Sequence, residues 1–200
     1  MDVILLRHGQ TAGNRRGSYI GRTDEPLCDE GFHQAAAAGV RTDVPRVFVS
    51  PLQRARQTAS VCFPRAAQIV IEDLREMDFG DFEGRTADEM ESDAAYRGWV
   101  DGNCEGACPN GERIDLFQKR VAAAFDEAVR DAIRAGDTQL FIVAHGGTIM
   151  AILSAFTRSP ISYSDWHVKN CCGWRAVLDE SAWQNVPQLT DYRRFERLPL

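Results

Sequence analysis

The stretch Val3-Ile4-Leu5-Leu6-Arg7-His8-Gly9-Gln10-Thr11-Ala12-Gly13-Asn14 decides the fold and contains the first reactive side chains. Its first four residues are aliphatic without polar alternation, which is typical of a strand buried on both faces of a parallel sheet. Ligands bind beyond the carboxyl ends of such strands, so Arg7 and His8 are expected to face a binding crevice. Gly9 is expected to let the backbone turn tightly. Asn14 should lie within reach of the same ligand.

The same succession of apolar strand, polar turn and helix recurs along the chain. Ser50 and Pro51 suit the cap and first turn of a helix, and Gly136 ends another one. Strands alternating with helices predict a three-layer α/β/α sandwich with a mainly parallel central sheet. No element is assigned from residue 182 onward. Strands are expected at residues 3–6, 46–50, 68–71, 139–144 and 174–178, and helices at residues 29–40, 52–62, 112–135 and 149–156.

A small cap insertion is expected at about residues 78–111, within a single domain that covers residues 1–200. Two glycines and two phenylalanines between residues 79 and 84 indicate a packed loop. The polar and acidic stretch that follows has aromatic anchors at Tyr96 and Trp99 and ends in a Cys-Pro-Asn-Gly turn.

Charge and hydropathy exclude several classes of protein. The net charge of −6 argues against a nucleic-acid partner, because binding to a phosphate backbone normally needs a basic face. No apolar run approaches the ~20 residues of a membrane span. The first residues show no basic segment or cleavage site of a signal peptide, so a cytoplasmic location is expected.

The cysteines are expected to be free thiols. A chain without a secretory signal rarely forms disulfides. Cys104 and Cys108 together with Cys171 and Cys172 could be read as zinc ligands. Their spacing matches no common zinc motif, and the adjacent pair suits tetrahedral geometry poorly, so no metal is predicted.

Polar groups follow several of the predicted strands. Arg7 and His8 follow the first strand, Arg54 lies one helical turn after the second, Glu76 follows the third, and His145 follows the fourth. Each alone reads as an ordinary surface or turn residue. Parallel strands place their carboxyl ends at one edge of the sheet, so the joint occurrence predicts one site.

At Leu6-Arg7-His8-Gly9-Gln10-Thr11, at Ser50-Pro51-Leu52-Gln53-Arg54-Ala55 continuing to Ala59, and at Ala144-His145-Gly146-Gly147, the chain resembles the histidine phosphatase superfamily, the phosphoglycerate-mutase-like proteins. The resemblance runs through nearly the whole chain. It implies that His8 is the phosphorylated nucleophile, that Glu76 is the general acid, and that no cofactor or metal is needed. Arg7, Arg54, His145 and Asn14 would surround the phosphoryl group. The substrate-binding residues are predicted to be Asn14, Thr11, Gly21, Arg22 and Gly146.

The chemistry explains these residue types. A neutral imidazole can attack phosphorus and form a phosphohistidine, which divides one displacement into two easier ones. Neighbouring guanidiniums disfavour the protonated imidazole and stabilise charge on the phosphoryl oxygens. A carboxyl group with a raised pKa can protonate the leaving alkoxide and then activate water.

Residues 74–86, together with Pro109-Asn110-Gly111-Glu112, look like the phosphatase branch that includes alpha-ribazole phosphatase. Phe82 stands where a tryptophan is common, Arg113 where a serine is usual, and Cys28 where a threonine is usual. These differences lie outside the reacting residues and leave the natural substrate open.

The sequence thus predicts a metal-independent phosphoric monoester hydrolase that acts on a small phosphorylated metabolite, with alpha-ribazole phosphate as one candidate. Two alternatives remain. A phosphoglycerate mutase would need extra cationic residues to bind the carboxylate of its substrate. The residues that follow Glu76 here are acidic instead: Asp78, Asp81 and Glu83. A catalytically weak phospho-ligand-binding protein is the other. The oligomeric state, monomer or homodimer, is left open.

Overall fold

A computed structural model of the chain describes residues 1–102, 104 and 106–199. Within these residues, six strands form one sheet in the order β3-β2-β4-β1-β5-β6. The pairs β2–β3, β2–β4 and β1–β4 are parallel, and β5 is antiparallel to both β1 and β6. The predicted α/β fold with a mainly parallel sheet is therefore confirmed. The strands are β1 (Asp2–Arg7), β2 (Arg46–Val49), β3 (Ala67–Val70), β4 (Gln139–Ala144), β5 (Gly173–Leu178) and β6 (Leu189–Phe195).

Strand β1 is apolar throughout because it faces two hydrophobic cores. Val3 and Leu5 belong to one core, and Ile4 and Leu6 belong to the other. All four side chains are at most 1% exposed. A strand covered on both faces has no solvent side on which polar residues could alternate.

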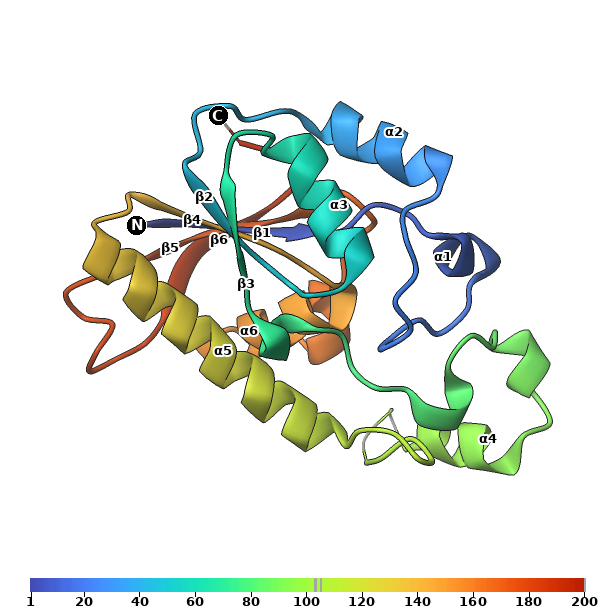
Figure 1. The fold of residues 1–200 in the computed structure, drawn as a ribbon. Coiled ribbons are helices and arrows are strands. Elements are labelled where there is room, and N and C mark those ends of the chain that lie inside the picture. Colours follow the sequence, from blue (N-terminus) through green and yellow to red (C-terminus); the bar gives the residue numbers. More distant parts are fainter. Residues whose placement is uncertain (103, 105, 200) are drawn as a thin grey trace.

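Helices cover both faces of the sheet (Figure 1). Helices α2 (Asp29–Ala38) and α3 (Gln53–Cys62) pack on the face of Ile4, while α5 (Ile114–Ala135) and α6 (Gly146–Phe156) pack on the face of Leu5. The short α1 (Ala12–Arg16) follows β1, and α4 (Ala94–Asp101) lies beyond the end of the sheet. The 3₁₀ helices are η1 (Glu72–Leu74), η2 (Gly80–Phe82), η3 (Asp88–Met90) and η4 (Tyr163–Trp166).

The connection from β3 to α5, residues 71–113, carries η1, η2, η3 and α4. Tyr96 and Trp99 are each 8% exposed and pack with Tyr19 and Phe82, so they anchor this connection as an aromatic cluster. The division into one domain with an insertion at about residues 78–111 stays a prediction.

One local prediction was wrong, and two elements were missed. Ser50 is not the cap of α3, because the cap position is Leu52 and the Ser50 hydroxyl contacts His145 instead. Helix α1 was missed because five residues are too short to show a helical period. Strand β6 was missed because its sequence, Leu-Thr-Asp-Tyr-Arg-Arg-Phe, is mostly polar and lies at the sheet edge.

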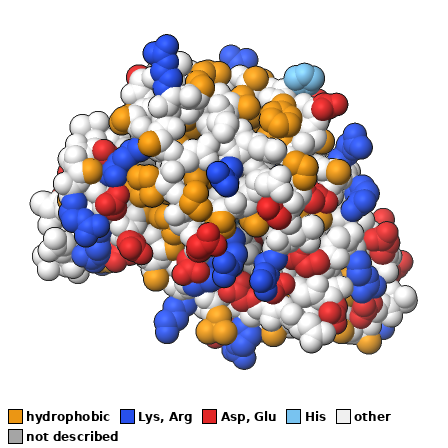
Figure 2. Space-filling model, in the orientation of Figure 1, with side chains coloured by type: hydrophobic (Ala, Val, Ile, Leu, Met, Phe, Trp, Pro, Cys, Tyr) orange, Lys and Arg blue, Asp and Glu red, His pale blue; other side chains and the backbone are white. Residues whose placement is uncertain are grey.

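The surface carries charges of both signs. Figure 2 shows Lys and Arg side chains interspersed with Asp and Glu on the face drawn. Among the helices of the described residues, none combines the length and apolarity that a bilayer crossing requires.

Candidate active site

The register of the sheet brings three predicted site segments together. Arg7 at the end of β1 pairs with Ala144 at the end of β4, and Val49 of β2 pairs with Val143 of β4. The residues that follow these strands are therefore neighbours. The His8 amide donates to the Ala144 carbonyl (3.0 Å), and the imidazole rings of His8 and His145 lie 5.1 Å apart.

His8 is held as a buried imidazole whose neutral form is favoured. Its side chain is 3% exposed, and its Nδ1 lies 2.7 Å from the Gly9 carbonyl oxygen, which can only accept a hydrogen bond. We therefore assign the proton to Nδ1, which leaves the lone pair on Nε2. Burial lowers the pKa of His8 well below its ordinary value, and the charges of Arg54 and Arg7 lower it further. The neutral form that can attack phosphorus is thus favoured.

Gly9 has a role other than the predicted tight turn. Its φ is not positive, but a Cβ atom at this position would lie 2.5 Å from the Gly31 carbonyl oxygen in α2. A glycine is needed because the backbone beside His8 packs directly against a helix.

Arg7 offers unused donors beside His8. Its Nη1 donates to the Val168 carbonyl (2.7 Å) and lies 3.1 Å from His167 Nε2, while its buried Nε has no acceptor among the described residues. Burial lowers the pKa of Arg7, whereas the nearby Glu76 carboxyl opposes this. A buried guanidinium with a free N–H suits an anionic ligand.

Arg54 is fully buried and held from three directions. Nε donates to His145 Nδ1 (3.2 Å), Nη1 to the Thr23 carbonyl (2.7 Å), and Nη2 to the Gly21 carbonyl (2.7 Å). Because His145 Nδ1 accepts from Arg54, its proton is on Nε2, which donates to Ser50 Oγ (2.6 Å). Both nitrogens of His145 thus serve to orient its neighbours.

Asn14 and Thr11 cap α1 reciprocally. The Thr11 hydroxyl accepts from the Asn14 amide (3.1 Å), and Asn14 Oδ1 accepts from the Thr11 amide (3.2 Å). Asn170 Nδ2 also donates to Asn14 Oδ1 (3.2 Å) and to the His8 carbonyl (3.0 Å). With Oδ1 held by two donors, Asn14 Nδ2 is left to donate to a ligand. Thr11 is buried, and its hydroxyl is used in the cap.

Glu76 lies against the first turn of α6. Its Oε2 accepts from the Gly147 amide (2.8 Å) and its Oε1 from the Met77 amide (3.0 Å). A Cβ at Gly147 would lie 2.4 Å from Oε1, so a glycine allows this approach. Burial raises the pKa of Glu76 although these amides and the two arginines oppose it. The carboxyl group can therefore hold a proton to donate.

A cavity of about 740 Å³ joins several of these residues. Of the predicted site residues, Arg7, Asn14, Glu76 and Gly146 line it. The other predicted site residues do not line it: His8, Arg54, His145, Thr11, Gly21 and Arg22. Its wall also includes the apolar and aromatic side chains of Tyr19, Phe79, Trp99, Phe117, Met150 and Tyr163.

Gly21 and Arg22 connect the loop after α1 to the β3–α5 connection. Arg22 is exposed and pairs with Asp78 (2.9 Å). Gly21 packs so closely that a Cβ would lie 1.8 Å from the Met77 carbonyl oxygen. Gly21 is needed for this backbone contact, and its carbonyl holds Arg54.

Replacement of Gly21 by alanine is expected to lower the free energy of unfolding by about 1–3 kcal/mol, the usual cost of overpacking. The clash is with backbone, which cannot move aside cheaply. Gly98→Ala is the matched control, because Gly98 lies in α4 with nothing within 4 Å of the added carbon. Urea unfolding should show the control unchanged or slightly more stable. Equal stability of both variants would contradict the contact.

The described residues include no group of three or more His, Cys, Asp or Glu side chains arranged to hold a metal ion. All six cysteines are free thiols, and burial raises the pKa of Cys62 and Cys108 to about 12.

Sequence reasoning missed several residues that support the site. Asn170 and His167 lie just before β5, and Thr58 Oγ1 accepts from the Gly9 amide (2.9 Å) and donates to the Arg54 carbonyl (2.7 Å). Arg120 of α5 donates to the Glu76 carbonyl (3.0 Å). Thr58 lies four residues after Arg54 in α3, a spacing that could have drawn attention to it. The others follow no motif.

The fold and the site together define an α/β protein whose reactive groups converge beyond the carboxyl ends of parallel strands. A family model described as Histidine phosphatase superfamily (branch 1) matches residues 3–187. The chain belongs to the histidine phosphatase superfamily, and the resemblance read from its motifs is confirmed.

Curated relatives and solved structures agree with this assignment. The chain is 30% identical over 192 residues to GpmB of Klebsiella pneumoniae, provisionally named a phosphoglycerate mutase, with coverage of 92% of this chain and 87% of that protein. It is 32% identical over 163 residues to a provisionally named phosphoserine phosphatase 2 of Hydrogenobacter thermophilus, with 78% of each chain covered. The crystal structure of the alpha-ribazole phosphatase from Shigella flexneri superposes with a TM-score of 0.83 at 25% identity, covering 100% of this chain and 99% of that one. These names include phosphatases and a mutase, and phosphatase activity in general is supported.

Proposed function

We propose that this protein is a metal-independent phosphomonoesterase that hydrolyses a small phosphorylated metabolite through a phosphohistidine at His8. One observation carries the proposal. His8 presents Nε2 as its free nitrogen, with the charges of Arg7 and Arg54 acting on it, while Arg7 and Glu76 line one cavity.

The reaction proceeds in two displacements. His8 Nε2 attacks phosphorus, the bond to the ester oxygen breaks, and the Glu76 carboxyl gives its proton to the leaving oxygen. The Glu76 carboxylate then takes a proton from water as the water oxygen attacks phosphorus. The N–P bond breaks, and inorganic phosphate leaves with both side chains restored. Arg7, Arg54 and Asn14 bind the phosphoryl oxygens throughout.

The cavity favours an uncharged leaving group with apolar surface. Because Glu76 lines the cavity, the group that it protonates must lie there too. Among the described wall residues, the cationic side chains are Arg7 and Arg113, and Arg113 is paired with Asp115 (2.8 Å). A phosphoglycerate carboxylate would therefore find little to bind, which favours hydrolysis over the mutase alternative.

Two further wall residues favour a leaving group that carries hydrogen-bonding groups. Ser18 Oγ and Trp99 Nε1 are buried without a partner among the described residues, and both residues line the cavity. A buried donor without an acceptor is costly, so a ligand that supplies one is favoured. Alpha-ribazole phosphate, which combines a ring system with a sugar, is the candidate we propose to test first.

The test is release of inorganic phosphate from a panel of esters. The panel should include alpha-ribazole phosphate, phosphoserine, sugar phosphates, phosphotyrosine and 3-phosphoglycerate, with isomerisation of 3-phosphoglycerate followed in parallel. We expect hydrolysis, with an acid-labile and base-stable label on the protein. Efficient isomerisation with little phosphate release would favour the mutase, and neither turnover nor label would favour a phospho-ligand-binding protein.

The pH profile of kcat/KM should be a bell whose acid limb reports His8 and whose alkaline limb reports Glu76. His8 must be neutral, and its lowered pKa means that protonation removes activity only well below pH 6.5. Glu76 must be protonated, so activity falls as the pH rises through its raised pKa. The lowered pKa of His8 extends activity toward low pH, and the raised pKa of Glu76 extends it toward high pH.

Comparison of the wild type with Glu76→Gln separates this effect from ionisation of the ester itself. Dividing kcat/KM of the wild type by that of Glu76→Gln cancels the ester's own titration. This wild-type-to-variant ratio should fall as the pH rises, because only the wild type has a general acid to lose. A ratio independent of pH would contradict the assignment of Glu76.

A further inference from the structure

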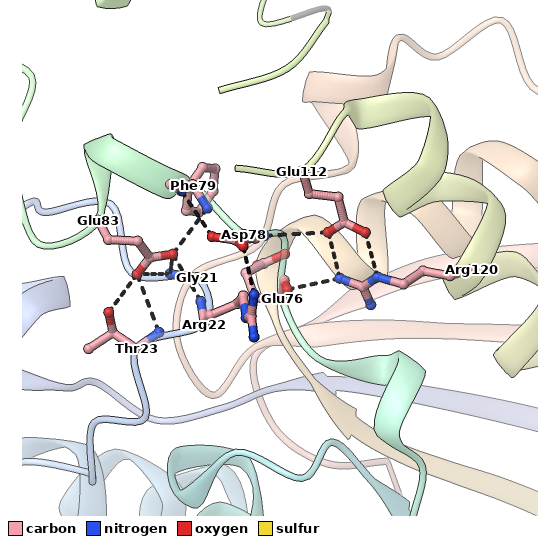
Figure 3. Close-up of polar contacts among 10 residues, drawn as sticks. Gly21, Arg22, Thr23, Glu76, Asp78, Phe79, Glu83, Glu112 and Arg120 are labelled. Carbon is pink, nitrogen blue, oxygen red and sulfur yellow. Dashed lines mark hydrogen bonds and ion pairs between the residues drawn. The ribbon is translucent and has the colours of Figure 1, made fainter. Parts of the chain in front are cut away.

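We infer that two carboxylates of the β3–α5 connection position the two halves of the site, one half each. Glu83 holds Arg54 through the backbone of residues 20–23, and Glu112 holds the main chain of Glu76 through Arg120. The inference rests on the proposed function, in which Arg54 binds the phosphoryl group and Glu76 protonates the leaving group. Figure 3 shows the two carboxylates with the groups that they bind. Asp78 joins the two groups, because its amide donates to Glu112 Oε2 (3.4 Å) and its carboxylate pairs with Arg22 (2.9 Å).

Glu83 binds one side of the loop after α1. Its Oε1 accepts from the amides of Gly21 (3.1 Å) and Arg22 (2.9 Å). Its Oε2 accepts from the Thr23 amide (3.3 Å) and the Thr23 hydroxyl (2.6 Å). The Phe79 amide also donates to Oε1 (3.1 Å), which ties the carboxylate to its own connection. One carboxylate thus collects the N–H groups of three successive residues (Figure 3).

Arg54 binds the opposite side of the same peptide groups. The peptide between Gly21 and Arg22 donates its N–H to Glu83 and accepts from Arg54 Nη2 at its carbonyl (2.7 Å). The peptide between Ile20 and Gly21 does the same, with a longer contact to Nη2 (3.5 Å). Successive hydrogen bonds polarise one another, so the negative charge of Glu83 strengthens the carbonyls that hold the buried guanidinium.

Glu112 acts on the other half. Arg120 donates from Nε to Glu112 Oε1 (2.7 Å) and from Nη2 to Oε2 (2.9 Å), a bidentate pair. The same guanidinium donates to the carbonyls of Asp73 (2.8 Å), Arg75 (3.0 Å) and Glu76 (3.0 Å). With Glu112 fixing its orientation, Arg120 thus fixes the main chain that leads to the Glu76 carboxyl group.

We call the first arrangement the Glu83 clamp (Glu83, the backbone of residues 20–23 and Arg54) and the second the Glu112 clamp (Glu112, Arg120 and the main chain of Glu76). The two clamps predict different effects on the rates. Every ester presents the same phosphoryl group to Arg54, so loss of the Glu83 clamp should slow all esters by a similar factor. Glu76 acts on the leaving oxygen, so loss of the Glu112 clamp should slow esters of basic alcohols most. A merely structural role for either carboxylate would not separate the two effects.

The experiment compares Glu83→Gln and Glu112→Gln on substituted phenyl phosphates and on an alkyl phosphate. For Glu83→Gln we expect kcat/KM to fall roughly tenfold to hundredfold on every ester, the effect of about one charge-assisted hydrogen bond. Binding of inorganic phosphate, measured by calorimetry, should weaken by a similar factor. For Glu112→Gln we expect a steeper dependence on leaving-group basicity with unchanged phosphate affinity.

Glu91→Gln is the matched control, because Glu91 is an exposed carboxylate of the same connection, and it should match the wild type in all measurements. Thr23→Val removes only the hydroxyl donor to Glu83 and gives a milder variant if Glu83→Gln fails to fold. It should change phosphate binding in the same direction. Unchanged phosphate affinity in the folded variant would overturn the Glu83 clamp, and equal slowing of all esters by Glu112→Gln would overturn the Glu112 clamp.

These outcomes are separable from failure of the proposed function. A wild-type protein that releases no phosphate from any ester would overturn the hydrolase proposal. The calorimetric comparison would still decide the Glu83 clamp, because phosphate binding needs no turnover.

Discussion

His8→Ala should abolish phosphate release from every ester, with a loss on the order of 10⁶-fold, the scale for removal of an enzyme nucleophile. The substitution deletes the only atom placed to bond phosphorus in the proposed mechanism, His8 Nε2. Arg7 and Arg54 remain, but electrostatic stabilisation without a nucleophile leaves water to attack directly. Initial rates on p-nitrophenyl phosphate and on an alkyl phosphate measure the effect. The loss should be similar for both esters.

Two controls distinguish loss of chemistry from loss of structure. His8→Gln retains most of the side-chain volume, and the variant should melt near the wild-type temperature. Inorganic phosphate should still bind, since neutral glutamine leaves both arginines in place. The acid-labile label should disappear. A label that persists in His8→Ala would show that another side chain, with His145 the nearest imidazole, is the phosphorylated group.

The fold could be predicted where the sequence pattern has a single physical explanation. The unbroken apolar run from Val3 to Leu6 is expected only for a strand covered on both sides, and both cores are present. Parallel strands then bring their carboxyl ends to one edge, so the proximity of His8 and His145 follows from topology. Strand β6 has no such pattern, because it forms by pairing with β5 and has mostly solvated side chains.

The contacts within the site depend on choices that local sequence leaves open. The Ser50 hydroxyl could cap α3 or bind a distant partner, and it binds His145, 95 residues away. Asn170 reaches His8 from a loop that shows no motif. Tertiary packing decides both.

Local sequence also leaves open which acidic residue near Glu76 is the proton donor. Sequence shows Asp78 and Glu83 as carboxylates near the expected acid, so either could replace Glu76 in that role. In the structure Glu83 accepts hydrogen bonds from a loop, and Asp78 pairs with Arg22. Neither of them lines the cavity, whereas Glu76 does. Geometry therefore favours Glu76 on grounds that spacing along the chain could not supply.

Glu76→Gln should slow esters according to the basicity of their leaving group. General acid catalysis contributes about 10²–10⁴ in rate, and an alkyl phosphate, whose alkoxide is strongly basic, should lose nearly all of it. p-Nitrophenyl phosphate leaves as a stable phenolate and should lose far less in the phosphorylation step.

The measurement must isolate that step, because in the proposed mechanism Glu76 also activates water in dephosphorylation. The phosphorylation burst or kcat/KM does so. Glutamine also turns an amide N–H₂ toward the Gly147 or Met77 amide, which disturbs the site equally for both esters. The ratio of the two losses removes this common effect, so it reports proton donation alone. Asp78→Asn is the matched control, and its losses on the two esters should be equal, which gives a ratio near one. If Glu76→Gln slows both esters equally, the proton comes from another group, and the buried position of Glu76 at α6 has a different purpose.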